Sequence, residues 1–85
     1  MPDVFEFPCE FPVKVMGRAS DDFRRHAREI VERHAGPLTE DQVIERRSRD
    51  DNFVSLTFTF RAASREQLDA LYRELTAAED ILIVL

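Results

Sequence analysis

The chain has 85 residues, of which 44% are hydrophobic, and its formal net charge is −5. This length allows one domain with a modest core, and the acidic balance disfavours nucleic acid, whose phosphates need a concentrated basic face. The longest apolar run, Ile81 to Leu85, is far too short to cross a bilayer, so no membrane association is expected.

Residues 1–10 are predicted to form an extended arm. They carry three acids and no base, and two Phe-Pro pairs follow each other at a spacing of four. Proline biases the residue before it toward extended conformations. We expect the arm to lay Phe5 or Phe7 over an otherwise exposed apolar patch. Alternating residues 11–16 then predict a first strand, which Gly17 ends.

Residues 21–34 predict the first helix. Ser20 suits the N-cap position, Asp21 and Asp22 complement the helix dipole in the first turn, and Gly36 follows the helix as a stop signal. Helical spacing predicts three charge pairs along this helix: Arg25 with Glu29, Arg28 with Glu32, and Glu29 with Arg33.

A hairpin is predicted next, made of a charged edge strand over residues 42–48, a polar turn over 49–52 and a strand over 53–60. The second strand is the strongest signal in the chain. Its apolar residues alternate with hydroxyl residues: Val54, Leu56, Phe58 and Phe60 against Ser55, Thr57 and Thr59. Because side chains alternate across a strand, this pattern predicts a sheet that is covered on one face and open on the other.

The last elements are a helix and an apolar strand. Ser64 to Gln67 form a capping box that begins a helix extending to about Ala77, and residues 81–85 predict a final strand. We expect Ile81, Ile83 and Leu85 to face the helices. Leu82 and Val84 then lie on the open side with Met16, and such an exposed patch marks an interface more often than a solvent face. Cover by the arm and weak self-association into a homodimer both remain open.

The order β-α-β-β-α-β with right-handed crossovers predicts an α+β fold. It is the ferredoxin-like sandwich, in which a four-stranded antiparallel sheet carries two helices on one face. We expect residues 1–85 to form a single domain.

The loop from Gly17 to Ser20 joins the first strand to the first helix. Backbone amides at a helix start can hold an anion, and Arg18 could contribute its charge. The loop resembles that of acylphosphatases, which hold phosphate with an arginine, so a small acylphosphatase-like hydrolase is the alternative function. We favour a tight turn in which Gly17 supplies unusual backbone angles, because Asp21 and Asp22 would repel a phosphate.

No metal site, cofactor or catalytic group is predicted. His26 and His34 are eight residues apart, whereas zinc ligands on one helix are usually four apart. Cys9 is the only cysteine and lies beside acids that disfavour its thiolate. No general base stands at a recognisable spacing, so the chain is not expected to be an enzyme. A single cysteine without a signal-peptide pattern predicts the cytoplasm.

The candidate site lies on the open face and the adjoining loop. A single lysine on a hydroxyl-lined surface suits recognition of a carboxylate, whereas the aromatic platform of RNA-recognition domains is missing. The candidate ligand- or partner-binding residues are Lys14, Met16, Gly17, Arg18, Ser55 and Thr57. The candidate interface residues are Leu82 and Val84.

Four stretches together resemble the YbeD family of small bacterial proteins, a domain of unknown function. They are Phe7-Pro8-x-x-Phe11-x-x-Lys14-Val15-Met16-Gly17, Asn52-Phe53-x-Ser55-Leu56-Thr57, Glu66-Gln67-x-x-x-Leu71-Tyr72-x-Glu74-Leu75 and the Val84-Leu85 end. The resemblance implies an ACT-like fold, and ACT domains bind small molecules between paired subunits near the loop that holds Gly17. Family members are often encoded near lipoyl-attachment enzymes. We therefore expect a regulatory or interaction module that binds a protein partner or a small metabolite, such as an amino acid or a lipoate-related compound.

Overall fold

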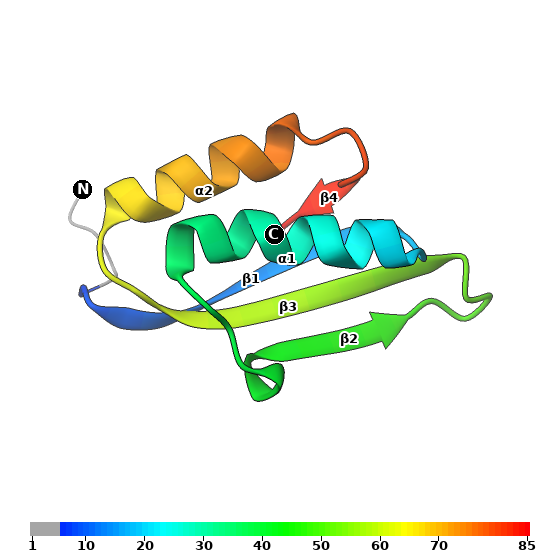
Figure 1. The fold of residues 1–85 in the computed structure, drawn as a ribbon, viewed down its shortest axis with the longest axis horizontal. Coiled ribbons are helices and arrows are strands. Elements are labelled where there is room, and N and C mark those ends of the chain that lie inside the picture. Colours follow the sequence, from blue (N-terminus) through cyan, green and yellow to red (C-terminus); the bar gives the residue numbers. More distant parts are fainter. Residues whose placement is uncertain (1–5) are drawn as a thin grey trace.

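The structure is a computed structural model and describes residues 6–85. It has two layers, a four-stranded antiparallel sheet and two helices that cover one of its faces (Figure 1). The strand order is β2-β3-β1-β4. The elements are β1 (Cys9–Arg18), α1 (Asp21–Ala35), η1 (Glu40–Gln42), β2 (Val43–Arg47), β3 (Phe53–Ala62), α2 (Arg65–Ala77) and β4 (Ile83–Val84). This arrangement confirms the ferredoxin-like prediction.

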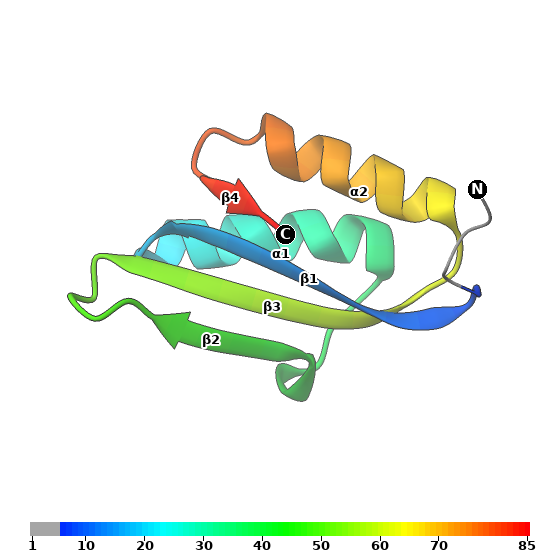
Figure 2. The ribbon, with the colours of Figure 1, turned by 180° about the vertical axis from the view of Figure 1, so that it is seen from behind.

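The central strands β1 and β3 pair along their whole lengths and form the middle of the sheet (Figure 2). The predicted alternation along β3 is confirmed, because Phe58 and Phe60 are buried in the core that the helices cover. Leu71 and Leu75 of α2 and Ile30 of α1 are buried in the same core. One face of the sheet is therefore sealed, and the other face lies away from the helices.

Both helices begin where the sequence predicts. The Ser20 hydroxyl accepts a hydrogen bond of 3.0 Å from the Phe23 amide at the start of α1. At α2, the Ser64 hydroxyl accepts a bond of 3.1 Å from the Gln67 amide. The Gln67 side chain accepts from the amide of Ala63 rather than from that of Ser64, so only half of the predicted capping box forms. A side-chain acceptor satisfies an amide that would otherwise lack a partner at the start of the helix.

Gly17 differs from its predicted role. It lies inside β1, which continues to Arg18, and its backbone does not adopt the left-handed conformation of a glycine turn. A Cβ atom at this position would stand 2.5 Å from the Phe23 ring and 2.7 Å from the backbone oxygen of Asp80. Glycine is therefore required here by close packing, and the predicted turn is wrong.

The final strand is shorter than predicted and faces the other way. Val84 pairs with Val15 and packs against the core, whereas Ile83 pairs with Met16 on the open side. The reason lies just before the strand, where Ile81 is buried and its amide donates to the carbonyl of Ala78. Ile81 is buried as expected, but this turn shifts the alternation after it, so the expected orientation of residues 82–85 is corrected.

The charge pairs along α1 also differ from the prediction. Arg28 lies 3.5 Å from Glu32 as expected. Arg25 instead pairs with Asp22 at 2.6 Å, and Arg33 pairs with Glu74 of α2.

Over residues 6–85, no helix is long and apolar enough to span a membrane.

Candidate functional site

The open face is the side of the sheet that the helices leave uncovered. Lys14, Met16, Ser55 and Thr57 all lie on it, because the open-side positions of β1 pair with those of β3. Lys14 is opposite Thr57, and Met16 is opposite Ser55. The structure therefore brings together the predicted residues that the two central strands contribute.

The strand register extends these pairs into two rows that cross all four strands. The pairing of β2 with β3 and of β4 with β1 fixes the outer members. At the β4 end of one row, the Leu85 amide donates to the Lys14 carbonyl at 2.8 Å, and the Lys14 amide donates back at 3.1 Å. The first row is Ile44, Thr57, Lys14 and Leu85. The second row is Arg46, Ser55, Met16 and Ile83.

Exposed apolar side chains stand at both edges of these rows. Ile44 is 55% exposed on β2, Ile83 is 46% exposed on β4 and Leu85 is 68% exposed beyond it. Leu82, also exposed, lies instead beside the loop at Arg18 to Ser20. An apolar patch of this kind, bordered by polar groups, is typical of a surface that a partner covers.

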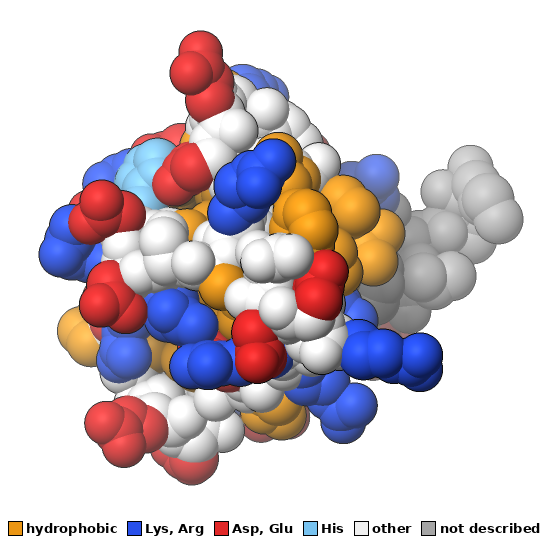
Figure 3. All heavy atoms as spheres, turned by 90° about the vertical axis from the view of Figure 1, so that its right-hand side faces the viewer, with side chains coloured by type: hydrophobic (Ala, Val, Ile, Leu, Met, Phe, Trp, Pro, Cys, Tyr) orange, Lys and Arg blue, Asp and Glu red, His pale blue; other side chains and the backbone are white. Residues whose placement is uncertain are grey.

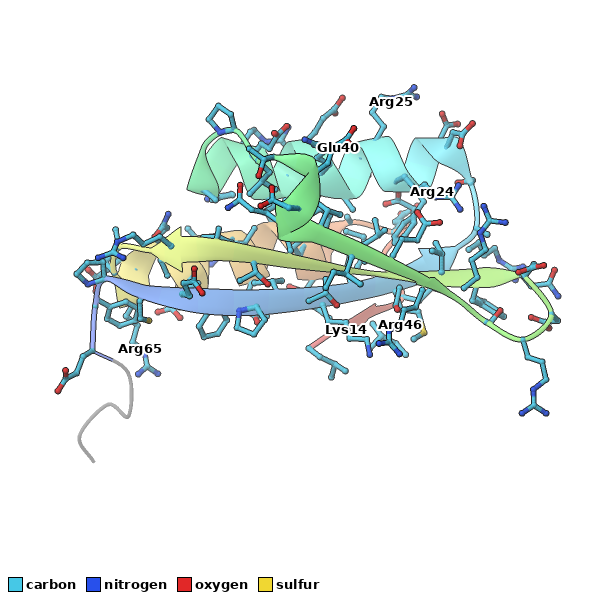
Figure 4. The ribbon with its side chains drawn as sticks, turned by 90° about the horizontal axis from the view of Figure 1, so that it is seen from below. Lys14, Arg24, Arg25, Glu40, Arg46 and Arg65 are labelled. Carbon is cyan, nitrogen blue, oxygen red and sulfur yellow. The ribbon has the colours of Figure 1, made fainter. Side chains whose placement is uncertain are left out.

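Two cations lie on the open face, Lys14 on the central strand β1 and Arg46 on the edge strand β2, and neither forms an ion pair with a described residue. Figure 4 shows both side chains on the side of the sheet away from α1, whereas Arg24 and Arg25 lie beside that helix. On α1, by contrast, Arg24 binds Glu45 at 2.7 Å and Arg25 binds Asp22 at 2.6 Å.

A shallow hollow of about 120 Å³ lies in the second row. Its lining includes Met16, Arg46, Phe53 and Ser55, and the Ser55 side chain forms part of its buried floor. Ligand pockets for small molecules usually measure about 300–1,000 Å³. The hollow therefore suits one inserted side chain better than a whole metabolite.

Gly17 and Arg18 do not join this surface in the predicted way. Gly17 is buried under the Phe23 ring on the helix-covered side. The Arg18 guanidinium lies over the Phe53 ring, 5.6 Å from its centre, at the end of the sheet. The exposed carboxylates of Asp21 and Asp22 stand in the first turn of α1. The loop geometry lends no support to the acylphosphatase alternative.

Both histidines of α1 contact acids on the segment that contains α2 and the loop after it. His26 Nδ1 lies 2.9 Å from the Asp80 carboxylate, and His34 Nε2 lies 2.8 Å from that of Glu74. Hydrogen bonds from Arg33, and then from His34, hold the pKa of Glu74 below its ordinary value of 4.5. Acidic and basic side chains are also interspersed on the surface at the end of the molecule that carries the β2–β3 turn (Figure 3). The contacts of His26 and His34 connect α1 with α2 and with the loop after α2, and they lie away from the open face.

The arm does not cover the open face with Phe7. Phe7 packs against the helix-covered core at its edge and lines a hollow with Phe11 and Tyr72. Phe11 meets the Tyr72 ring edge-on, with ring centres 6.4 Å apart. Phe5, the other residue expected to provide cover, lies outside the described residues.

Sequence reasoning missed Arg46 and the apolar edge residues Ile44, Ile83 and Leu85. The predicted hairpin could have placed Ile44 and Arg46 of β2 on the open face. A polar turn at 49–52 places residue 48 opposite residue 53, as the bond of 2.9 Å from the Ser48 amide to the Phe53 carbonyl shows. Counting back from that pair puts Arg46 opposite Ser55 and Ile44 opposite Thr57. The orientation of Ile83 and Leu85 had no such signal, because it depends on the turn at Ile81.

Comparison with known proteins finds similarity over almost the whole chain. The family model described as "Protein of unknown function (DUF493)" matches residues 2–85. A UPF0250 protein of Chromobacterium violaceum is 43% identical over 83 residues, which cover 98% of this chain and 93% of that protein. One of Paraburkholderia phytofirmans is 40% identical over 82 residues, with coverages of 96% and 92%. Their names state no activity, ligand or partner.

Proposed function

We propose that this chain, which belongs to the DUF493 family of proteins of unknown function, is a non-catalytic cytoplasmic module that docks a partner protein on its open face. The family membership agrees with the resemblance to the YbeD family that the sequence carries. The observation that carries the proposal is the pair of rows across the sheet. They place exposed apolar side chains at both edges of the sheet, Lys14 between them and Arg46 beside Ile44 on β2, and neither cation has an ion pair within residues 6–85.

Burial of the apolar edges supplies the driving force. Removing apolar surface from water stabilises a complex by roughly 25 cal/mol per Å², and three large side chains on one face offer such surface. The rows are also held by backbone hydrogen bonds, since β2, β3 and β1 are joined by continuous ladders, β4 pairs with β1, and Leu85 just beyond β4 forms two backbone bonds with Lys14. A rigid, partly apolar surface loses little entropy on binding.

The same geometry favours a protein over a small metabolite. The hollow in the second row is small. A larger hollow of about 480 Å³ lies beside the loop at Arg18 to Ser20, but its lining includes Glu79 and Asp80, whose charges oppose the carboxylate of such a ligand. On the open face, an amino acid or a lipoate-related compound would lie on the surface with most of its area in water. A protein segment can cover both rows at once.

A second copy of the chain is the less favourable partner. In a two-fold dimer the same patch meets itself, so the unpaired cations Lys14 and Arg46 of one copy would approach those of the other. Like charges brought together in this way oppose association. Light scattering over a range of concentrations measures the oligomeric state, and a dimer that Ile44→Thr/Ile83→Thr abolishes would show that the face is used for self-association instead.

The test replaces the apolar edges without changing strand propensity. We expect the double variant Ile44→Thr/Ile83→Thr to lose capture of a specific cytosolic protein that the wild type retains, with its thermal unfolding little changed. The matched control is Leu82→Thr, which alters an equally exposed residue beside the loop at Arg18 to Ser20. Mass spectrometry identifies the captured protein. Equal capture by the double variant, or no capture by the wild type, would contradict the proposal.

A further inference from the structure

We infer that the segment docked on the open face is acidic and amphipathic, with carboxylates that meet Lys14 and Arg46 and apolar side chains that cover Ile83 and Leu85. The inference rests on the proposed function and specifies the chemistry of the partner. It starts from the charge distribution of the strands.

The open-side positions of the strands are cationic in an acidic chain. They carry Lys14, Arg18, Arg46 and Arg61, against a single acid, Glu10. Glu10 pairs in register with Arg61 at the far end of the sheet, and Arg18 lies over Phe53. Between these two ends, the charged side chains at the open-side positions of the strands are therefore only Lys14 and Arg46, both cationic, although the whole chain has a net charge of −5. Complementary potential across an interface then requires an anionic partner.

The positions of the two cations define the spacing of the partner's acids. Strand β3 separates them, with Thr57 opposite Lys14 and Ser55 opposite Arg46. Two strand spacings across the sheet and an offset of two residues along the strands together amount to roughly 12 Å, so two carboxylates on one segment fit better than a single small anion. An arginine can hold a carboxylate with two parallel bonds, whereas a lysine acts as a point charge.

Apolar surface adjoins the cations along the same rows. Met16 and Ile83 follow Arg46 across the second row, and Leu85 follows Lys14 across the first. A segment whose carboxylates reach the cations therefore lays its remaining side chains on apolar surface. An acidic segment without apolar residues would leave that patch in water, and an apolar segment without acids would bury the two cations unpaired at a high cost.

Nucleic acid is the other polyanion that the cations could attract, and the face suits it poorly. The open positions of β3 carry one aromatic ring, that of Phe53, and the Arg18 guanidinium already lies over it. The other open positions, among them Ser55, Thr57 and Thr59, offer no ring for bases to stack on. The many acids elsewhere on the chain would also repel a phosphate backbone. Single-stranded RNA therefore serves as a competing probe.

The experiment measures fluorescence anisotropy with three labelled probes. They are a peptide of alternating Leu and Glu, the same peptide with Gln in place of Glu, and a single-stranded RNA. We expect the Glu peptide to bind about tenfold more tightly than the Gln peptide. Its affinity should fall as salt rises from about 0.1 M to about 1 M, where the screening length shrinks from about 10 Å to about 3 Å.

Charge-reversal variants locate the effect. Lys14→Glu/Arg46→Glu should weaken Glu-peptide binding at least about tenfold. The control Arg25→Glu/Arg73→Glu makes the same change in net charge on the exposed surfaces of α1 and α2, and should leave binding within about twofold.

Each contrary outcome has a distinct meaning. Equal binding of the Glu and Gln peptides, both lost in Ile44→Thr/Ile83→Thr, overturns the inference and leaves partner docking intact. Tighter binding of RNA, or equal loss in both charge-reversal variants, also overturns the inference. If neither the Glu peptide nor the Gln peptide binds, the inference is overturned as well. The proposed function fails with it only if the wild type captures no cytosolic protein, or if that capture is unaffected by Ile44→Thr/Ile83→Thr.

Discussion

Replacing Gly17 with alanine tests whether this glycine is required by packing. The added Cβ would lie 2.5 Å from Cε1 and 2.6 Å from Cδ1 of Phe23, and 2.7 Å from the carbonyl oxygen of Asp80. Neither neighbour can yield easily. Phe23 is buried in the core, and the loop at Asp80 is held to α1 by the His26 contact at 2.9 Å. The extra methyl must therefore displace the loop, the ring or the strand.

Two opposing effects determine how much Gly17→Ala changes the free energy of unfolding. Overfilling a packed site costs about 1–3 kcal/mol. Alanine also restricts the unfolded chain, which favours folding by about 0.4–1 kcal/mol. The net expectation for Gly17→Ala is a loss of about 1–2 kcal/mol in the free energy of unfolding. For a domain of this size that corresponds to a fall in Tm of roughly 5–15 °C.

Urea and thermal unfolding followed by circular dichroism measure the loss. The contrasting variant is Gly36→Ala, where φ is +85° and no atom lies within 4 Å of the added Cβ, so its cost comes from backbone strain alone. In a Phe23→Leu background, which lacks part of the ring, Gly17→Ala should cost less and Gly36→Ala the same. If Gly17→Ala keeps wild-type stability, or if its cost is the same in both backgrounds, the packing explanation is wrong.

Three further predictions concern the cap, an acid pair and the open face. Ser20→Ala should lower the free energy of unfolding by about 1 kcal/mol in urea titration, because α1 loses its capping acceptor, and Ser20→Asp should restore most of it. The pKa of Glu74 is lowered in the fold, first by the hydrogen bond from Arg33, so its stabilisation exists above the unfolded-state pKa near 4.5 and is lost as pH falls through the folded-state pKa. Thermal unfolding at pH 7 should separate wild type from Glu74→Gln by about 0.2–1 kcal/mol, and at pH 3 by less; a gap that widens in acid would contradict this sign. Lys14→Ala and Arg46→Ala should each change stability by less than about 0.5 kcal/mol while weakening partner binding, since neither cation has an ion pair to lose within residues 6–85. A larger loss of stability would mean that these side chains support the fold.

The sheet and its covered face could be predicted because the signal is local. A strand that alternates Leu56, Phe58 and Phe60 with hydroxyl residues has only one face to bury, so the orientation of β3 follows from period two. The helix starts could be predicted for a similar reason, since a serine side chain such as that of Ser20 bonds an amide three residues away. These rules need no knowledge of distant parts of the chain.

The role of Gly17 could not be predicted because it depends on residues brought close only by the fold. Phe23 comes from the next element and Asp80 from the far end of the chain, and both approach within 3 Å of the absent side chain. Glycine in a loop motif usually indicates unusual backbone angles, and the sequence analysis therefore predicted a turn. In the structure it is the absence of a side chain at Gly17 that matters.

The prediction of ion pairs and of the last strand's orientation failed for a similar reason, because both depend on contacts that spacing along the sequence does not record. Spacing along α1 predicted intrahelical partners for Arg33, but the nearest carboxylate in the fold belongs to Glu74 of α2. The orientation of Val84 depended on the turn at Ile81, which no alternating pattern records. The sequence consequently predicted which residues of β1 and β3 share the open face, but not the residues of β2 and of the last segment that extend it.

The most direct test of the account maps the bound partner on the isotope-labelled protein. Amide and methyl shifts are recorded while the captured partner, or its binding segment, is added. The account predicts that shifts concentrate on the two rows, from Ile44 and Arg46 through Lys14 and Met16 to the chain near Ile83, and that the outer surfaces of α1 and α2 stay unchanged. Shifts confined to the helices or to the loop at Arg18 to Ser20 would contradict it.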